Sequence, residues 1–286
     1  MQILIAAASL AVVGVVGREL LASPSEAEEL TIPLRVRVQP FKNGDAWQPA
    51  EVREKFSSAG SAIVICDMWD RHWCDGATQR VAGMAPRMDS VLRMARQAGV
   101  LVIHAPSDTM EFYKDYPQRL LALRAPVVEP PKNLELPDPP LPIDDSDGGC
   151  DTPGNKEHNA WTREIPLLSM GPQDAISDNG AEIYNLLKQR NIQTLFVMGV
   201  HTNMCILNRS FAIKQMTRWG VRCVLVRDLT DAMYNPASRP FVSHAVGTGL
   251  VIEHIEKHWC PTTKSGDLMA VMERVLAAKG EAAPKP

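Results

Sequence analysis

The chain has 286 residues, a hydrophobic content of 45%, a charged content of 22% and a formal net charge of -3 at pH 7. These values are ordinary for a globular protein that is long enough to bury a sizeable core. Because the net charge is slightly negative and no basic patch stands out, the sequence argues against a nucleic-acid partner.

The amino terminus is apolar over residues 1–16 apart from Gln2 and Ser9, and a charged segment follows at Arg18. This apolar stretch is short for a membrane span, and small residues at 22–27 can precede a cleavage site. We therefore predict that residues 1–28 are an export signal or an N-terminal anchor. The protein is then periplasmic or extracellular. A buried first strand or helix is the weaker alternative.

The first half of the chain predicts a parallel sheet. Residues 31–38 alternate apolar and polar side chains, as a half-exposed strand at a sheet edge would. Residues 61–67 form a buried strand, residues 86–98 a helix with Pro86 in its first turn, and residues 100–104 the next strand. A strand, a helix and a second strand in this order make a parallel β-α-β unit.

A proline-rich segment at about 125–160 interrupts this rhythm. Its apolar content is too low for a core, so we expect an ordered loop or lid over the body of a single domain that spans 29–286. Asp144, Asp145, Asp147 and Asp151 could hold a calcium ion, but the spacing of an EF-hand loop is absent. Solvated turns are the better interpretation of this acidic run.

Strands and helices alternate again after the insertion. The predicted order is a short strand at 175–177, a helix at 181–190, a strand at 195–200, a helix at 203–219, strands at 221–228 and 248–253, and a helix from 265. The whole pattern predicts a three-layer α/β/α, Rossmann-like, doubly wound and mostly parallel sheet.

The six cysteines show no C-x-x-C pairing of the metal-binding type. Cys66 and Cys223 lie in apolar strand patterns and are interpreted as core residues. Cys74, Cys150 and Cys260 lie in loop-like segments, where an oxidising compartment would allow one disulfide and leave the third cysteine over.

Cys205 stands where a buried strand gives way to a helix. Asn203 can cap this helix, and the unpaired N–H groups and positive dipole end of its first turn would favour a thiolate. We therefore predict that Cys205 is an activated nucleophile, next to N–H groups that could hold an oxyanion. A small, inert core residue is the alternative.

Asp67 and Asp228 each end a predicted strand. In a sheet of order 3-2-1-4-5-6 the first and fourth strands are adjacent, so Asp67 and Cys205 are expected to face each other across the ligand crevice. A carboxylate beside a thiol can take its proton and pass it later to a leaving amine.

The motifs Val64-Ile-Cys-Asp67 and Gly199-Val-His-Thr-Asn-Met-Cys205 resemble those of the isochorismatase-like cysteine hydrolases, which include nicotinamidases, N-carbamoyl amidohydrolases and isochorismatase. The resemblance covers roughly residues 61–253. It implies that Asp67 is the general base and Cys205 the nucleophile that attacks a carbonyl carbon.

The resemblance also implies how the oxyanion hole is built. Its donors would be the backbone N–H groups of Met204 and Cys205, and the peptide bond between Val200 and His201 would be cis. The lysine that completes the family's site is missing, because the corresponding segment from Asp174 to Ala181 contains no lysine. Lys156 and Arg163 are the candidates for the missing positive charge, although an arginine cannot shuttle a proton.

Further side chains are expected around the pocket. These candidates are Trp69, His72, His104, Arg163 and His201. Trp69 could contact substrate or pack as part of a lid. Asp70-Arg-His72 has the Asp-x-His spacing of the nicotinamidase metal site but follows a different strand. Since neutral histidines commonly serve as hydrogen-bond partners, we expect no required cofactor, and a bound divalent metal is the lesser alternative.

Three functions follow from these observations. The first is a cysteine hydrolase that cleaves a C–N bond of a small amide or carbamoyl substrate through an acyl-enzyme. The second is a non-catalytic or degenerate protein that binds a ligand or partner on the same fold. The third is a metal-dependent hydrolase that uses Asp67, Asp70, His72 and His104. The expected partners are a small-molecule substrate and further copies of the chain, with no membrane contact beyond the N-terminus.

Overall fold

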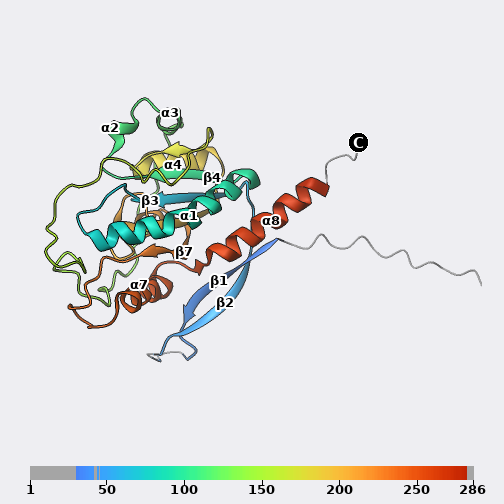
Figure 1. Ribbon diagram of the computed structural model, residues 1–286. Helices are drawn as coiled ribbons and strands as arrows, with labels where there is room; N and C mark the ends of the chain where they lie inside the picture. Colours follow the sequence, from blue (N-terminus) through green and yellow to red (C-terminus); the bar gives the residue numbers. More distant parts are fainter. Residues whose placement is uncertain (1–29, 42–43, 45, 282–286) are drawn as a thin grey trace, which may run out of the picture.

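A computed structural model describes residues 30–41, 44 and 46–281, so the predicted signal at 1–28 lies outside the described residues. Within these residues, eight strands form one sheet of order β2-β1-β8-β7-β6-β3-β4-β5 (Figure 1). The strands are β1 (Thr31–Val38), β2 (Gln48–Lys55), β3 (Ser61–Cys66), β4 (Leu101–Ala105), β5 (Ala175–Ile176), β6 (Thr194–Val200), β7 (Arg222–Asp231) and β8 (Thr262–Thr263). The strands from β8 to β5 are parallel, whereas β1 runs antiparallel to β2 and β8.

Helices cover both faces of this sheet and bury one apolar cluster on each. The helices are α1 (Asp75–Ala98), α2 (Met110–Tyr113), α3 (Pro117–Leu123), α4 (Gly180–Gln189), α5 (Cys205–Asn208), α6 (Ile213–Arg218), α7 (His244–His258) and α8 (Ser265–Glu281). α1 and α8 pack together on one face, and α4, α6 and α7 share the core of the other (Figure 1). The predicted three-layer α/β/α fold with a mostly parallel sheet is confirmed.

The two central strands bring the predicted nucleophile and base to one edge of the sheet. β3 and β6 are adjacent, and Cys66 pairs with Gly199 near their carboxyl ends. Gly199 has a φ of 117°, and a Cβ atom there would lie 2.0 Å from the carbonyl oxygen of Cys66. Only glycine permits so close an approach in this conformation. The strand order also confirms that the first and fourth strands of the parallel part are neighbours.

Two predictions for the first half of the chain are wrong. β1 is not the edge strand, because β2 pairs along its whole length and occupies the edge instead. α1 begins at Asp75 and carries Pro86 in its interior. Pro86 removes one helical hydrogen bond, but buried side chains continue on both sides of it, from Val81 to Met88, so packing on the sheet outweighs that loss.

The predicted strand at 248–253 is part of the helix α7. Ser243 caps this helix by accepting a hydrogen bond from the N–H of Val246, and the buried residues Gly247, Val251 and Ile255 repeat with a helical period. The short apolar run at 250–252 cannot by itself distinguish a strand from a buried helix.

The predicted helix at 203–219 is also wrong, since it is divided into α5 and α6. Asn203 does not cap it: its side chain contacts Asp145 and the backbone of Met233 instead. The backbone at Arg209 turns to an extended conformation with a ψ of 149°, which ends α5 after one turn. β7 ends three residues later than predicted, at Asp231, and Asp228 within it accepts hydrogen bonds from Ser265 at the start of α8.

Candidate active site

Asp67 and Cys205 meet at the carboxyl ends of β3 and β6. The Asp67 carboxylate is fully buried and forms a hydrogen bond with the Cys205 thiol. Its Oδ1 accepts a hydrogen bond from the N–H of Ser107 at 2.8 Å. Asp67 has a φ of 48°, a left-handed conformation that is uncommon for residues other than glycine and clusters at functional sites. The two predicted catalytic side chains therefore share one site.

The positive charge of this site comes from Arg209, which the sequence interpretation missed. Its Nε donates to Asp67 Oδ2 at 2.9 Å, and its Nη2 lies 3.2 Å from Asp108 Oδ2. A signal was available, because Arg209 follows Cys205 by four residues and such pairs lie on the same side of a helix. The N–H of Arg209 indeed donates to the carbonyl of Cys205 at 3.0 Å.

The electrostatics favour a protonated thiol at Cys205. Burial and the charge of Asp67 raise the pKa of Cys205, which corrects the expectation of a thiolate in the free protein. Burial also raises the pKa of Asp67, but Arg209 and the hydrogen bonds from Cys205 and Ser107 oppose this rise. The α5 helix has only one turn, so its dipole cannot outweigh the neighbouring carboxylate.

The backbone around the nucleophile matches the implied oxyanion hole only in part. The peptide bond between Val200 and His201 is cis, at the position that the resemblance implies. Among the described residues, the N–H of Cys205 donates to no hydrogen-bond acceptor, and Cys205 lines the adjoining pocket. The N–H of Met204 donates to the carbonyl of His201 at 3.0 Å, so it is already engaged and the prediction for this donor is not supported.

A pocket of about 440 Å³ opens at the nucleophile. Its walls come from α5, from the turn before it and from the proline-rich insertion. The lining residues are Leu141, Asp145, Asn203, Met204, Cys205, Asn208 and Arg209. This volume is sufficient for a small organic molecule.

Three of the predicted pocket residues form a packed aromatic cluster. Trp69 is 5% exposed and stacks on Trp161, with ring centroids 4.3 Å apart, while its Nε1 donates to the carbonyl of Ser107. The rings of His72 and His201 meet edge to face at 4.9 Å. Burial lowers the pKa of His72 to about 4 and that of His201 to about 3, so both rings are neutral. Packing is therefore the role of Trp69 that its contacts support.

His104 does not face this pocket. It is fully buried, and its two ring nitrogens lie 2.7 Å from Glu164 Oε2 and 3.2 Å from Asp174 Oδ2. Arg96 completes the group by pairing with Asp174. Burial alone would lower the pKa of His104, but the two carboxylates raise it to about 9. The prediction of a pocket histidine is wrong here, because β4 directs this side chain into a separate ion network.

The two cations proposed from sequence also lie elsewhere. Arg163 is exposed, and its guanidinium lies over the ring of Phe112 at 5.5 Å from the centroid. Lys156 is exposed in the insertion and does not line the pocket at Cys205. Asp70 accepts hydrogen bonds from Thr162 instead of joining His72.

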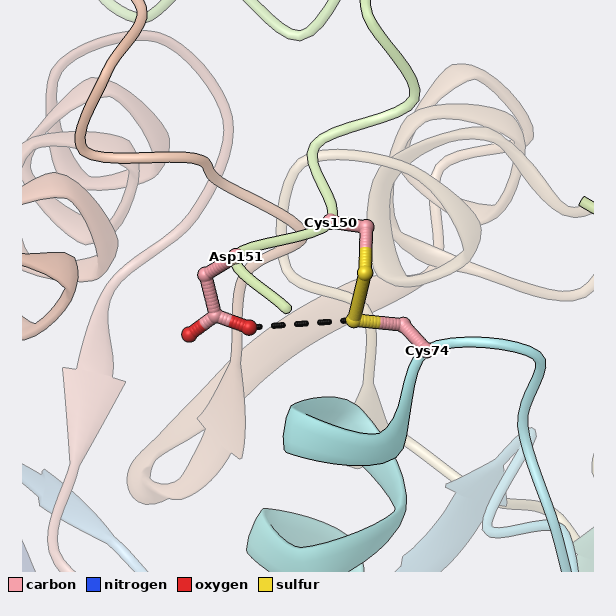
Figure 2. Close-up of side chains that lie close together, drawn as sticks. All are labelled: Cys74, Cys150 and Asp151. Atoms are coloured by element: carbon pink, nitrogen blue, oxygen red, sulfur yellow. Dashed lines mark hydrogen bonds between the residues drawn. A yellow bond between two sulfur atoms is a disulfide. The ribbon is translucent and has the colours of Figure 1, made fainter. Parts of the chain in front are cut away.

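The residues predicted to bind a metal, Asp67, Asp70, His72 and His104, are not the group that lies close enough together to do so. Across residues 30–41, 44 and 46–281, the group that comes close enough for one ion consists of Cys74, Cys150 and Asp151. Figure 2 shows why this group does not fit a metal: the two sulfur atoms form a disulfide, and Asp151 Oδ1 lies 3.7 Å from the sulfur of Cys74. A disulfide sulfur carries no thiolate charge, so the donor set is unsuitable for a cation.

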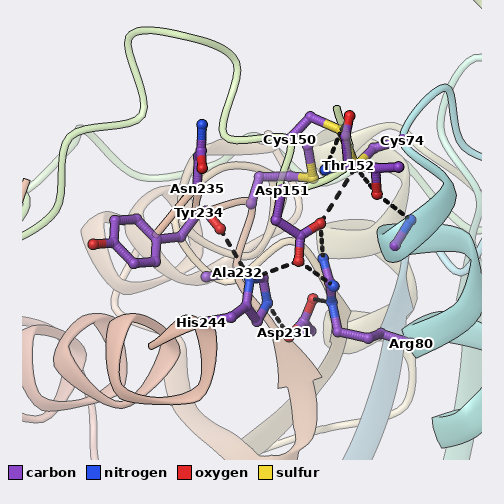
Figure 3. A network of polar contacts seen from close by, with 12 residues as sticks. Cys74, Arg80, Cys150, Asp151, Thr152, Asp231, Ala232, Tyr234, Asn235 and His244 are labelled. Carbon is purple, nitrogen blue, oxygen red and sulfur yellow. Dashed lines mark hydrogen bonds and ion pairs between the residues drawn. A yellow bond between two sulfur atoms is a disulfide. The ribbon is translucent and has the colours of Figure 1, made fainter. Parts of the chain in front are cut away.

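This disulfide fastens the insertion to the body of the protein. Asp151, next to Cys150, pairs with Arg80 of α1, and Arg80 also pairs with Asp231 at the end of β7 (Figure 3). His244 at the start of α7 lies 2.9 Å from Asp231 and 3.4 Å from Asp151. The insertion therefore lies fixed over the carboxyl edge of the sheet. Of the three predicted disulfide candidates, Cys260 is the one left over, and it is buried.

Comparisons with known proteins support the fold. No protein-family model matches the sequence, and no curated protein matches it either. A solved cysteine hydrolase from Pseudomonas syringae pv. phaseolicola 1448A is similar in structure, with a TM-score of 0.50, 19% identity, and coverage of 77% of this chain and 95% of its own. A putative isochorismatase from Burkholderia xenovorans LB400 gives a TM-score of 0.45 and 14% identity, with 78% and 95% covered.

The chain therefore has the α/β fold of the isochorismatase-like cysteine hydrolases, which confirms the predicted resemblance in fold. Within the part of the chain that the structure describes, no helix combines the length and the apolar character that crossing a bilayer requires.

Proposed function

We propose that this protein is a cysteine hydrolase that cleaves the C–N bond of a small amide or carbamoyl compound. The observation that carries the proposal is the position of Asp67, which contacts both the Cys205 thiol and the Arg209 guanidinium at the pocket. Asp67 can act as a base only while it is ionised, and Arg209 supplies the charge that keeps it so. An arginine suits this task because it stays charged at any working pH.

The reaction would begin when the carbonyl carbon of a bound amide reaches the Cys205 sulfur. Asp67 takes the thiol proton as the C–S bond forms, and the free N–H of Cys205 donates to the oxyanion. Collapse of the tetrahedral intermediate breaks the C–N bond, and Asp67 returns the proton to the leaving nitrogen. Water then attacks the thioester with Asp67 as base, which releases the acid and restores the thiol.

The second candidate, a degenerate binding protein, differs in what surrounds Asp67. A site that had lost its function would have no cation within reach of the base and the nucleophile. Arg209 supplies that cation, and Cys205 is a free thiol, so both observations favour catalysis. The metal-dependent alternative is not favoured, because the described contacts of His104 and Asp70 lead away from Asp67.

The test is a screen of small amides and carbamoyl compounds with the full chain, with ammonia release as the readout. We expect Cys205→Ser and Cys205→Ala to lower the rate at least about 1000-fold on any substrate found. Cys260→Ala, which changes a buried free cysteine away from the pocket, should keep it. Full activity in Cys205→Ala would refute the nucleophile. A folded protein that hydrolyses nothing in the screen would favour the binding alternative.

We further propose that the protein is exported and works in an oxidising compartment. The disulfide between Cys74 and Cys150 supports this, because such bonds are rare in reducing cytosols. Fractionation of the producing cell, followed by mass analysis of the N-terminus, tests it. A protein found with reduced Cys74 in the cytosol would contradict the proposal. Assembly into a homo-oligomer also stays a proposal, and sedimentation of the purified protein tests it.

A further inference from the structure

Three carboxylates and one guanidinium lie in the wall of the pocket at Cys205 or directly behind it. Asp67 and Asp108 are both paired with Arg209, so one guanidinium already faces two carboxylates. Asp145 adds a third carboxylate to the wall of the same pocket. Among the described residues that line the pocket, Arg209 is the one cation, and it already pairs with two carboxylates.

Asp145 is held in place by a neutral partner. Its Oδ2 accepts a hydrogen bond from Asn203 Nδ2 at 2.7 Å, and Asn203 is fixed in turn by two hydrogen bonds to the backbone of Met233. Among the described residues, Asp145 forms no ion pair, and its side-chain partner is the neutral amide of Asn203. Hydrogen bonds from Ser146 lower the pKa of the neighbouring Asp144, and Arg239 lowers it further.

Two constraints hold the part of the insertion that follows Asp145: a close backbone contact at Gly149 and a disulfide at Cys150. Gly149 has a φ of 69°, and a Cβ atom there would lie 2.3 Å from the carbonyl oxygen of Met233, so the insertion lies tightly against the chain that follows β7. The next residue, Cys150, is bound to Cys74. Asp145 is thus a fixed part of the wall.

We infer that Asp145 determines the charge of the substrate, and that the enzyme takes small amides or carbamoyl compounds that carry an ammonium group and rejects those that carry a carboxylate. The inference rests on the proposed function and names its substrate class. A cation in the pocket would face Asp145, whereas an anion would meet the carboxylates of Asp145, Asp67 and Asp108 beside one arginine, whose Nε and Nη2 atoms already bind two of them.

Charge selection can be measured at Cys205 without any turnover. The probes are three methanethiosulfonates that differ in charge, with a cationic aminoethyl, a neutral methyl and an anionic sulfonatoethyl group. Their rates of reaction with Cys205 are followed by intact mass spectrometry and divided by their rates with 2-mercaptoethanol. Cys205→Ala gives the background from the other free cysteines, which are buried.

We expect the cationic probe to react at least about tenfold faster than the anionic one after this correction. Asp145→Asn, which keeps the shape of the side chain, should lower that ratio roughly fivefold. Asp144→Asn is the matched control, because it removes the same charge one residue away from an exposed side chain outside the pocket, and the ratio should hardly change.

Equal or faster reaction of the anionic probe would overturn the inference, and so would an equal effect of the two asparagine variants. A matched series of amides that differ only in an ammonium, hydroxyl or carboxylate group then gives the order of kcat/KM. If no amide is hydrolysed but the probes still show the ratio, the hydrolase proposal fails while the charge selection stands. If amides are hydrolysed without the ratio, only the charge selection fails.

Discussion

Two buried carboxylate centres lie side by side at the carboxyl edge of the sheet, one after β3 and one on β4. Asp67 has an arginine, a thiol and an adjoining pocket. His104 lies between Glu164 and Asp174, and Arg96 closes that group, so two positive charges balance two negative ones. The Cys205 sulfur of the first centre lines a pocket that a ligand can enter, whereas His104, Glu164 and Asp174 of the second centre are buried away from that pocket.

This difference explains why the strand-end position alone does not identify a catalytic residue. His104 and Asp67 follow the same rule, since both stand near the carboxyl ends of parallel strands. The two residues differ in whether the surrounding charges of opposite sign are balanced within the protein. A saturated ion network contributes to conformational stability, whereas an incompletely satisfied site can bind and transform a substrate.

The largest effect is expected from Arg209. Arg209→Gln removes the charge that opposes the burial of Asp67, so the pKa of Asp67 rises and the base becomes protonated at a higher pH. We expect kcat on any substrate found to fall about 100- to 1000-fold, with the acid limb of the pH profile moved to higher pH. Arg209→Lys should recover part of the rate.

Asp108→Asn is the control for this change, because it removes the other carboxylate partner of Arg209 and leaves the contact with Asp67. We expect a change of less than about fivefold. If Arg209→Gln kept its rate and its acid limb, the assignment of this arginine as the partner of the base would be wrong.

The His104 centre should appear in stability. The pKa of His104 is about 9 in the folded protein against 6.5 for a free histidine. The contribution of this charged histidine to the free energy of unfolding is therefore fully present below pH 6.5 and is lost as the pH rises through 9. We expect the free energy of unfolding to fall by roughly 3 kcal/mol over this window, measured by urea denaturation. His104→Gln should flatten the dependence.

His158→Gln provides the comparison, because His158 is exposed and its ring forms a hydrogen bond with the carbonyl of Lys156 in its own loop. This variant should keep the pH dependence of the parent. Should His104→Gln fail to fold, Glu164→Gln removes one of the two carboxylates and should reduce the same slope. An unchanged slope in both variants would contradict a charged His104.

The smallest effect is expected from the link between Cys74 and Cys150. Cys74→Ser with Cys150→Ser frees the insertion that supplies Leu141 and Asp145 to the pocket. We expect a loss of about 2 kcal/mol in unfolding free energy and a severalfold rise in KM, with a smaller change in kcat. A variant that lost stability but kept KM would show that the disulfide does not position the pocket wall.

The sequence by itself determined the central strands and the meeting of Asp67 with Cys205. An uninterrupted apolar run specifies a buried parallel strand, and the β-α-β rule makes the first and fourth strands neighbours. These are local or topological constraints, so the pattern of residues is sufficient. The same reasoning narrowed the disulfide to three cysteines, and the structure chose Cys74 and Cys150.

Only the tertiary structure decided which charges surround those two residues. Arg209 and Asp67 are 142 positions apart, and their contact depends on the break between α5 and α6. The tertiary structure also decided the charge of His104 and the protonation of Cys205. Both depend on buried carboxylates that are far away in the sequence but close in space. The burial of a group and the electrostatic effect of its surroundings depend on all of its neighbours in space, and the order of residues in the sequence does not specify those neighbours.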